Sequence, residues 1–247
     1  MNREQRLEML GRLAEVPSVE LKMNIPADQR MAVSGLELDL MRGRLREVFF
    51  FDTPDLILYR NGLVTRARRT QGDDDDTVVK LRPAEPATLP AAVRDSKNLK
   101  VEMDVTRGAY VVSASLEGVR KPGTVREAVT GDRPLERLFT KEQRALFADH
   151  VPPGVSWNDL VPLGPVLVVL LKWLPKGFPN KTTIEQWHYP GQVPLVELST
   201  KATPQTVLEV YAGAVKFVQG YGLSTTGPQE PKTRKALEFF ARTHPSR

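Results

Sequence analysis

The sequence of 247 residues contains no cysteine. Disulfide bonds, thiolate chemistry and cysteine-based zinc sites are therefore excluded. Its three histidines, His150, His188 and His244, are scattered without the spacing of metal ligands, which argues against a histidine-rich zinc site. With 40% hydrophobic and 26% charged residues, the composition is that of an ordinary globular protein.

Long hydrophobic runs are also lacking. The longest, Val166 to Leu171, is far shorter than the roughly 20 residues that a membrane-spanning helix needs. The first residues lack the basic-then-apolar form of a signal peptide, so we expect a cytoplasmic protein. The formal net charge of +5 suggests anionic partners, but it is too small to decide between nucleotides and nucleic acid.

The hydrophobic periodicity predicts an α+β fold in one domain, with about eight antiparallel strands and helices outside them. Strands are expected at 18–23, 47–51, 63–68, 77–82, 100–105, 166–174, 182–189 and 194–201. Helices are expected at 3–15, 27–44, 141–149, 204–221 and 231–241, and residues 110–161 are expected to be mostly helical.

Local signals add detail. In the first helix, Leu7, Leu10 and Leu13 are expected to share one face. Thr53 as N-cap and Pro54 at the first helical position predict a short helical turn. The four acids of Asp73–Asp76 are interpreted as a solvated hairpin loop rather than a metal site.

The polar face of the strands is more informative. Residues two apart in a strand share a face, as Arg66 and Arg68 do. In strand after strand this face carries long cations and carboxylates rather than Ser, Thr, Asn and Gln. These residues are Glu20, Lys22, Arg66, Arg68, Lys80, Arg82, Lys100, Glu102, Asp104, Lys172, Glu185, Glu197 and Lys201.

Two interpretations fit this pattern. A half-solvated antiparallel sheet has one polar face, and its charges need no function. Alternatively, the sheet closes into a barrel, which removes the exposed edges and gathers the charges in a lumen. The pattern of residues alone does not separate the two.

A charged lumen would have definite chemistry. Clustered arginines and lysines repel one another in a restricted space unless a polyanion neutralises them. Arginine forks match phosphate oxygens, and lysine supplies a compact charge. Carboxylates in the same space are explained if they hold Mg²⁺ or Mn²⁺, which prefer oxygen ligands and bridge to phosphates. Mutual neutralisation of acids and bases without a ligand is the alternative.

Several segments together resemble the CYTH, or triphosphate tunnel metalloenzyme, superfamily. The resemblance is carried by Phe50–Asp55, Arg66–Arg68, Val79–Arg82, Lys100–Asp104 and Leu195–Lys201, in this order and spacing. It implies one tunnel domain over residues 1–247, an eight-stranded antiparallel closed barrel with a mostly helical insertion at about 110–161 and C-terminal helices at 204–242. It also implies hydrolysis or cyclisation of triphosphate substrates with Mg²⁺ or Mn²⁺.

The resemblance further implies roles for residues at matching positions. Those expected to bind the triphosphate are Lys22, Arg66, Arg68, Lys80 and Arg82, with Lys172 and Lys201 adding to the set. Those expected to act as metal ligands, or as acids near the metal and its water, are Glu20, Glu102, Asp104, Glu185 and Glu197. Of these, Glu20, Glu102 and Asp104, together with Lys22, are the catalytic candidates.

One departure from the family pattern concerns the first strand. The family usually has Glu-x-Glu-x-Lys there, whereas this chain has Ser18, Glu20 and Lys22. Ser199 in the last strand likewise replaces a possible second carboxylate. Each serine removes a charge from the expected metal shell and should weaken cation affinity.

Three functions are therefore in competition. The leading one is metal-dependent hydrolysis of inorganic triphosphate or a nucleoside triphosphate. The first alternative is a class IV-like adenylyl cyclase, and the second is a non-catalytic module that binds triphosphate or polyphosphate. General nucleic-acid binding is disfavoured because the polar strand faces carry few aromatic residues. A monomer or homodimer without membrane contact is expected.

Overall fold

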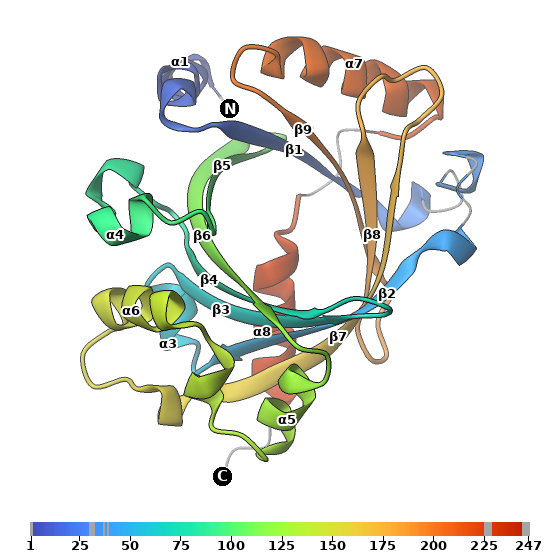
Figure 1. The fold of residues 1–247 in the computed structure, drawn as a ribbon. Helices are drawn as coiled ribbons and strands as arrows, with labels where there is room; N and C mark the ends of the chain where they lie inside the picture. Colours follow the sequence, from blue (N-terminus) through green and yellow to red (C-terminus); the bar gives the residue numbers. More distant parts are fainter. Residues whose placement is uncertain (1, 30–32, 37, 39, 225–228, 244–247) are drawn as a thin grey trace. The chain divides into compact units, whose positions relative to one another are not determined.

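The structure is a computed structural model that describes residues 2–29, 33–36, 38, 40–224 and 229–243. Figure 1 shows the strands that these residues form. The strands are β1 Ser18–Ile25, β2 Arg44–Asp52, β3 Leu63–Thr70, β4 Asp75–Leu81, β5 Leu99–Thr106, β6 Ala109–Arg120, β7 Val161–Trp173, β8 Thr182–His188 and β9 Leu195–Ala202.

The strands follow the hydrogen-bonded order β1-β5-β6-β4-β3-β2-β7-β8-β9 and close into a barrel. This confirms the α+β barrel but corrects two expectations, because the described residues form nine strands and the sheet is mixed. β1 pairs with β5 in parallel, with Glu20 opposite Asp104. Side chains alternate in the same way in parallel and antiparallel strands, so the sequence pattern could not show that β1 and β5 run parallel.

The additional strand is β6, which lies where a mostly helical insertion was expected to begin. Its residues from Val112 to Leu116 are all buried, so polar and apolar positions do not alternate there. Small side chains such as Ser113 and Ser115 occupy one face and hide the period of two from the sequence. Short helices do follow it, between Thr124 and Asp159.

The helices agree with the sequence except at residues 27–44 and at residues 91–94, where a short helix forms that was not predicted. They are α1 Arg3–Arg12, α3 Ile57–Arg60, α4 Ala91–Arg94, α5 Thr124–Thr130, α6 Lys141–His150, α7 Val207–Gly220 and α8 Lys232–Thr243. The described residues within 27–44 do not continue as one helix over the expected range, and residues 30–32, 37 and 39 lie outside the described residues. Instead, 3₁₀ turns form at Ala27–Gln29, Ser34–Leu36 and Leu40–Arg42. No helix of the described residues is long and apolar enough to cross a membrane.

The face that α1 buries also differs from the prediction. Met9 and Leu13 are buried, whereas Leu7 and Leu10 are exposed. The helix continues as a 3₁₀ turn, Leu13–Glu15, which leads into β1. Leu13 thus belongs to a 3₁₀ turn, which is tighter than an α-helix. The α-helical spacing that predicted a face shared with Leu7 and Leu10 does not apply to it.

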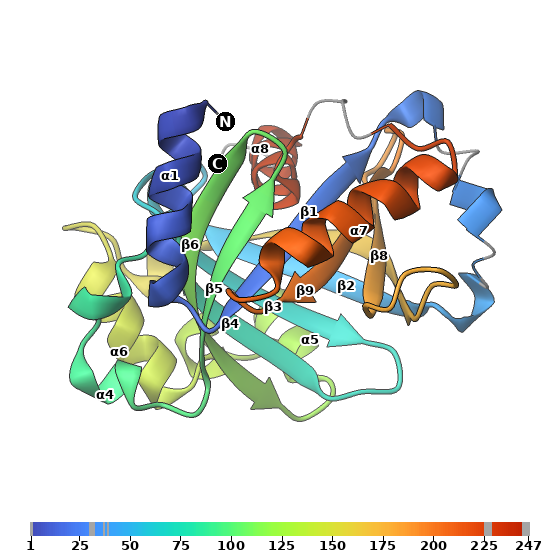
Figure 2. The same ribbon diagram turned by 90° about the horizontal axis from the view of Figure 1, so that it is seen from above.

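The chain forms two compact units, each built from separated segments. Unit 1 contains Met1–Arg44, Val101–Val112 and Val168–Pro231, and unit 2 contains Leu45–Lys100, Ser113–Leu167 and Lys232–Arg247. In unit 1, α7 covers one face of β1 and β9, as Figure 2 shows. That residues 1–247 form a single domain stays a prediction.

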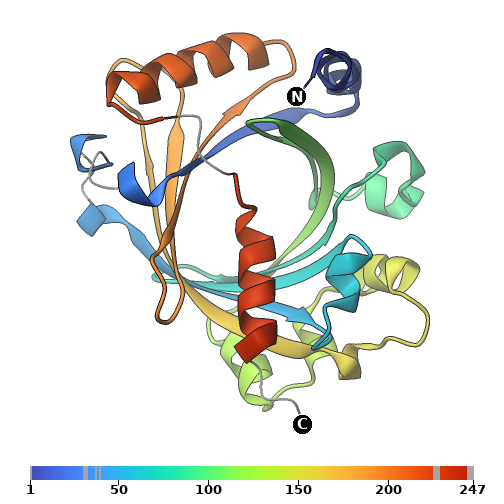
Figure 3. The same cartoon turned by 180° about the vertical axis from the view of Figure 1, so that it is seen from behind.

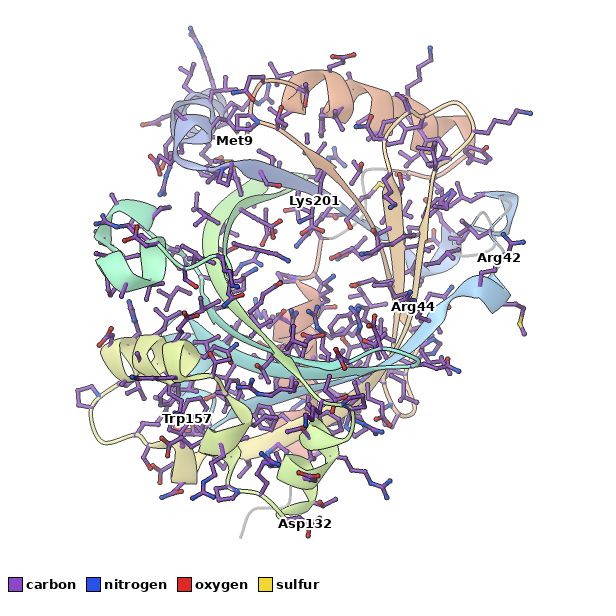
Figure 4. The ribbon with its side chains drawn as sticks, viewed as in Figure 1. Met9, Arg42, Arg44, Asp132, Trp157 and Lys201 are labelled. Atoms are coloured by element: carbon purple, nitrogen blue, oxygen red, sulfur yellow. The ribbon has the colours of Figure 1, made fainter. Side chains whose placement is uncertain are left out.

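In unit 2 one glutamine fixes α6 on the sheet. Gln143 Nε2 donates to the carbonyl oxygens of Thr77 (3.0 Å) and Leu116 (2.8 Å). Its Oε1 accepts from Thr77 Oγ1 (2.8 Å) and from the backbone N–H of Thr140 (2.9 Å). The side chain is fully buried, and all four hydrogen bonds of its amide group are satisfied. Beneath α6, Trp157 stacks on Phe147 with ring centroids 3.9 Å apart (Figure 4), so this tryptophan packs against the helix.

The turn after β2 is organised mainly by Asp52. Leu56 rather than Thr53 occupies the N-cap position of the helix that follows, although Thr53 Oγ1 accepts the backbone N–H of Ile57 (2.9 Å). The Asp52 carboxylate accepts backbone N–H groups of Thr53 (2.8 Å), Leu58 (2.9 Å) and Tyr59 (2.9 Å). Burial raises the pKa of Asp52 although these hydrogen bonds oppose the rise. Helix α3 begins at Ile57, three residues after Pro54, the predicted first helical position.

The acidic run is not wholly a solvated loop. Asp75 and Asp76 belong to β4, and Asp75 is buried. Its carboxylate accepts the backbone N–H of Val125 (3.0 Å), at the start of α5. Burial raises the pKa of Asp75. Only Asp73 and Asp74 remain in the exposed turn that was predicted.

Gly164 permits the close approach of β7 to β2. Its φ is 152°, and a Cβ atom built on it would lie 2.7 Å from the carbonyl oxygen of Val48. We expect Gly164→Ala to lower the free energy of unfolding by about 2–4 kcal/mol, because backbone must shift. Urea unfolding measures this. The control is Gly11→Ala in α1, where nothing lies within 4 Å; it should raise stability by up to about 1 kcal/mol. Equal stability of Gly164→Ala and the parent would contradict the close approach.

Candidate functional site

The charged residues of unit 1 gather on one face of β8, β9, β1 and β5. Residues directly opposite in paired strands lie on the same face. Glu20 lies opposite Asp104 of β5 and Lys201 of β9, and Glu197 of β9 lies opposite Glu185 of β8. The predicted site residues that the structure brings together on this face are Glu20, Lys22, Glu102, Asp104, Glu185, Glu197 and Lys201.

Lys22 is the centre of this acidic face. Its Nζ lies 3.0 Å from Glu20 Oε2 and 2.8 Å from Asp104 Oδ1. The side chain of Asp104 is only 1% exposed. Burial by itself would lower the pKa of Lys22, but the attraction of Asp104, Glu20 and Glu197 outweighs burial and raises it. Lys22 is therefore an ammonium at neutral pH and compensates these carboxylates.

Lys201 neutralises a second carboxylate in a more open place. It forms a salt bridge with Glu102 and points away from α7, as Figure 4 shows. Burial opposes the charge of Lys201, but the hydrogen bond and the charge of Glu102 outweigh it and raise the pKa. Because the Lys201 side chain is 58% exposed, this pair contributes much less to stability than the pairs of Lys22.

Three residues near this face were not identified from the sequence. Burial, followed by the charges of Glu230 and Glu197, raises the pKa of Tyr189. Asn24, which continues the alternation of Glu20 and Lys22 along β1, donates through Nδ2 to the carbonyl oxygen of Glu230 (2.6 Å). The alternation of polar residues along β1 could therefore have identified Asn24 from the sequence. Nothing in the sequence places Glu230 beside it, because some 200 residues separate the two.

Unit 2 carries a basic face on β3 and β4. Arg66 lies opposite Val78, and Lys80 lies opposite Val64, so these cations share a face. Arg68 lies opposite Asp76, and its Nε and Nη2 both approach Asp76 Oδ1 at 2.7 Å. Arginine and lysine thus outnumber carboxylates on these two strands, and such a surface favours an anionic ligand.

Arg82 follows β4 and lies near α8. The pKa of Tyr59 is raised, first by burial, while Arg234 and Arg82 oppose the rise. Arg234 of α8 also pairs with Glu238 at 2.7 Å. Figure 3 shows α8 on the near side of the strands of unit 2. The helix therefore brings a further arginine to the neighbourhood of Arg82.

The last predicted residue, Lys172, lies on β7 in unit 1 and is exposed. The structure thus assigns the predicted residues to two sets. The acidic face and Lys172 belong to unit 1, and the basic face and Arg82 belong to unit 2.

The acidic face has the donor chemistry of a divalent metal site but not its arrangement. Its oxygen donors suit Mg²⁺ or Mn²⁺, and its carboxylates outnumber its lysines. However, no three histidine, cysteine, aspartate or glutamate side chains in the described part of the chain are arranged to hold a metal ion. The ammonium of Lys22 lies between Glu20 and Asp104, and Glu102 pairs with Lys201. The described residues therefore do not form a preformed metal site.

The two lysines of this face predict a graded effect on stability. We expect Lys22→Met to lower the free energy of unfolding by about 3 kcal/mol, because it leaves buried carboxylates without their cation. Lys201→Met is the control, with an expected loss below about 1 kcal/mol because its pair is exposed. Urea unfolding at neutral pH measures both. Equal losses would contradict the central role of Lys22.

The same variant predicts a pH dependence. In the parent, the pKa of Lys22 is raised on folding, so its contribution is complete below the ordinary pKa of 10.5 and is lost only above it. Without Lys22, burial should raise the pKa values of Glu20 and Asp104 in the folded protein. The loss in Lys22→Met is therefore expected to shrink as the pH falls through those raised values. A loss that is independent of pH would contradict this account.

Comparison with known proteins supports the fold. No family model and no curated protein matches the sequence. A candidate adenylyl cyclase from Hippeastrum with a described dominant triphosphatase activity is 17% identical over 87% of this chain and 93% of its own, with a TM-score of 0.58. A candidate adenylate cyclase from Bacillus halodurans is 12% identical over 89% of this chain and 97% of its own, with a TM-score of 0.62. The chain thus has the CYTH fold, the fold of the triphosphate tunnel proteins.

Proposed function

We propose that the protein binds a small molecule that carries a triphosphate group and hydrolyses it. The observation that carries this proposal is the basic face of unit 2, where Arg66, Arg68 and Lys80 share one side of two paired strands. Cations held this close together favour a ligand with several negative charges. A triphosphate presents such charges in a row, and the forked donors of arginine match its oxygens.

The cations would bind the triphosphate and stabilise the negative charge that develops on it during hydrolysis. Those proposed to bind phosphate oxygens are Arg66, Arg68, Lys80, Arg82, Lys22, Lys172 and Lys201. Water would attack the terminal phosphorus and the bond to the bridging oxygen would break, so that the terminal phosphoryl group becomes orthophosphate and the remaining diphosphate is the leaving group. Fixed cations stabilise this step because they need no reorientation as the charge grows.

The acidic residues are proposed for the water and for a divalent metal. Glu20, Glu102 and Asp104 would accept the proton that the attacking water loses, directly or through solvent. Glu185 and Glu197 complete the carboxylates that would contribute to holding Mg²⁺ or Mn²⁺. When bound, such an ion would neutralise phosphate charge. Because the carboxylates are paired with lysines, we expect metal affinity to be modest and to rise when the triphosphate is present.

The two serines keep the alternatives open. Ser18 lies opposite Glu102, and Ser199 lies opposite Lys22, so a neutral hydroxyl occupies each position on the acidic face. Fewer carboxylates favour binding over turnover, which motivates the non-catalytic triphosphate-binding module. The Hippeastrum and Bacillus halodurans proteins, named as candidate cyclases, keep the adenylyl cyclase as the other alternative. A cytoplasmic location and the absence of general nucleic-acid binding belong to the same proposal.

Product analysis tests the proposed function. Inorganic triphosphate and ATP are each incubated with Mg²⁺, Mn²⁺ or a chelator, and orthophosphate, pyrophosphate and cyclic nucleotide are measured. We expect metal-dependent release of orthophosphate. Lys80→Ala should lower kcat/KM by about ten- to a hundredfold, because a hydrogen bond to a charged group contributes about 1.5–3 kcal/mol. Glu20→Ala should also lower turnover.

The control is Lys121→Ala, an exposed lysine in the turn after β6, which should leave kcat/KM unchanged. Pyrophosphate and cyclic nucleotide from ATP would replace the hydrolase with the cyclase. Triphosphate binding that Lys80→Ala abolishes, without turnover, would leave the binding module. Neither binding nor turnover would overturn the proposal.

A further inference from the structure

Helix α7 is apolar on two sides. Its inner side packs on unit 1 through Val207, Val210, Phe217 and Val218, and Phe217 stacks on Phe178 with centroids 5.5 Å apart. Inner packing of this kind is expected for a helix that covers a sheet. The outer side of such a helix is normally polar, and in α7 it is not.

The outer side carries an apolar stripe of Leu208, Tyr211, Ala212 and Val215. Their spacing of three, four and seven residues places them on one face of the helix. Leu208 is 64% exposed, Tyr211 is 48% exposed, Ala212 is exposed and Val215 is half-buried. Figure 2 shows the outer side of α7 uncovered by the drawn segments of unit 1. A cluster of exposed apolar side chains of this kind is typical of an interaction surface.

We propose that this stripe is the interface of a homodimer in which α7 of one copy packs antiparallel on α7 of a second copy about a two-fold axis. The stripe is symmetric about the point between Tyr211 and Ala212. In the antiparallel arrangement Leu208 lies opposite Val215 of the second copy, and Tyr211 lies opposite Ala212. Large side chains thus face smaller ones, and one surface serves both copies, as a two-fold interface requires.

The charges of α7 complement this arrangement. Glu209 and Lys216 are the only charged residues of the helix, and both are exposed. They are seven residues apart, so they lie on the same flank of the stripe, toward opposite ends of the helix. The antiparallel arrangement therefore brings Glu209 of each copy near Lys216 of the other. Two salt bridges form across the two-fold axis, and they fix the direction of pairing.

A cavity beside the stripe adds apolar surface. Its volume is about 70 Å³, and Tyr211, Ala214 and Val215 line it together with Leu198 and Phe217. The edge of the interface is thus apolar on the sheet side of α7 as well.

The same features disfavour a membrane as the occupant. An interfacial membrane helix carries an apolar face together with a row of lysines and arginines that attract anionic lipids. α7 has one lysine balanced by one glutamate. One helix of 14 residues is about 21 Å long, so the area it buries is below that of a standard interface. We therefore expect a weak, concentration-dependent dimer.

Sedimentation velocity over two decades of protein concentration tests the apolar stripe. The parent should shift from monomer to dimer as its concentration rises. Tyr211→Glu should remain monomeric throughout, because it places a carboxylate at the centre of the interface. Val193→Glu is the matched control, since Val193 is equally apolar and 58% exposed but lies in the turn before β9; its dimerisation should be unchanged. Both variants should unfold like the parent, because both positions are exposed.

Charge reversal tests the antiparallel arrangement. Glu209→Lys and Lys216→Glu should each weaken the dimer about tenfold, because like charges then face each other. The double variant Glu209→Lys, Lys216→Glu should recover the affinity of the parent, since both salt bridges re-form with reversed signs. This recovery would not occur if the single variants merely disturbed the helix.

Several outcomes would overturn the proposal. A parent that is monomeric at every concentration would do so, and so would a dimer that Tyr211→Glu leaves intact. A double variant as weak as the single ones would exclude antiparallel pairing. Binding of the monomeric parent to vesicles of anionic phospholipid, lost in Tyr211→Glu, would assign the stripe to a membrane instead. None of these readouts depends on triphosphate hydrolysis.

Discussion

The ammonium of Lys22 is the interaction on which the acidic face depends. Four neighbouring strands place carboxylates on one side of the sheet, and Asp104 is almost completely removed from water. Charges in that environment are tolerated only when a counter-charge compensates them. Lys22 lies within 3.0 Å of two of these carboxylates and supplies that counter-charge from within the chain.

This arrangement explains how the face relates to the proposed chemistry. Carboxylates that already hold an ammonium do not present a preformed metal site, and the serines at positions 18 and 199 remove two further potential ligands. An incoming triphosphate would compete with Glu20 and Asp104 for Lys22 and would thereby leave them free for a cation. Substrate and metal would then bind cooperatively, because each removes a charge that opposes the other.

Much of the site was predictable because the period of a strand is fixed. Alternation in Glu20 and Lys22, in Arg66 and Arg68, and in Glu102 and Asp104 placed each pair correctly on a polar face. The alternation of polar and apolar residues did not reveal β6, because residues on both of its faces are buried and those on one face are small. It also missed Asp75, whose burial arises from capping α5 some 50 residues later.

The sequence by itself determined the polar strand faces, the covering helices α6, α7 and α8, and the kinds of charge available to the site, because these follow from local periodicity and residue chemistry. Only the tertiary structure decided that β1 runs parallel to β5, that Lys22 lies between Glu20 and Asp104, and that the outer side of α7 stays exposed. The physical reason is distance along the chain. The direction of a strand, the partners of a salt bridge and the exposure of a helix face depend on segments that come into contact only after folding. No local sequence pattern predicts those contacts.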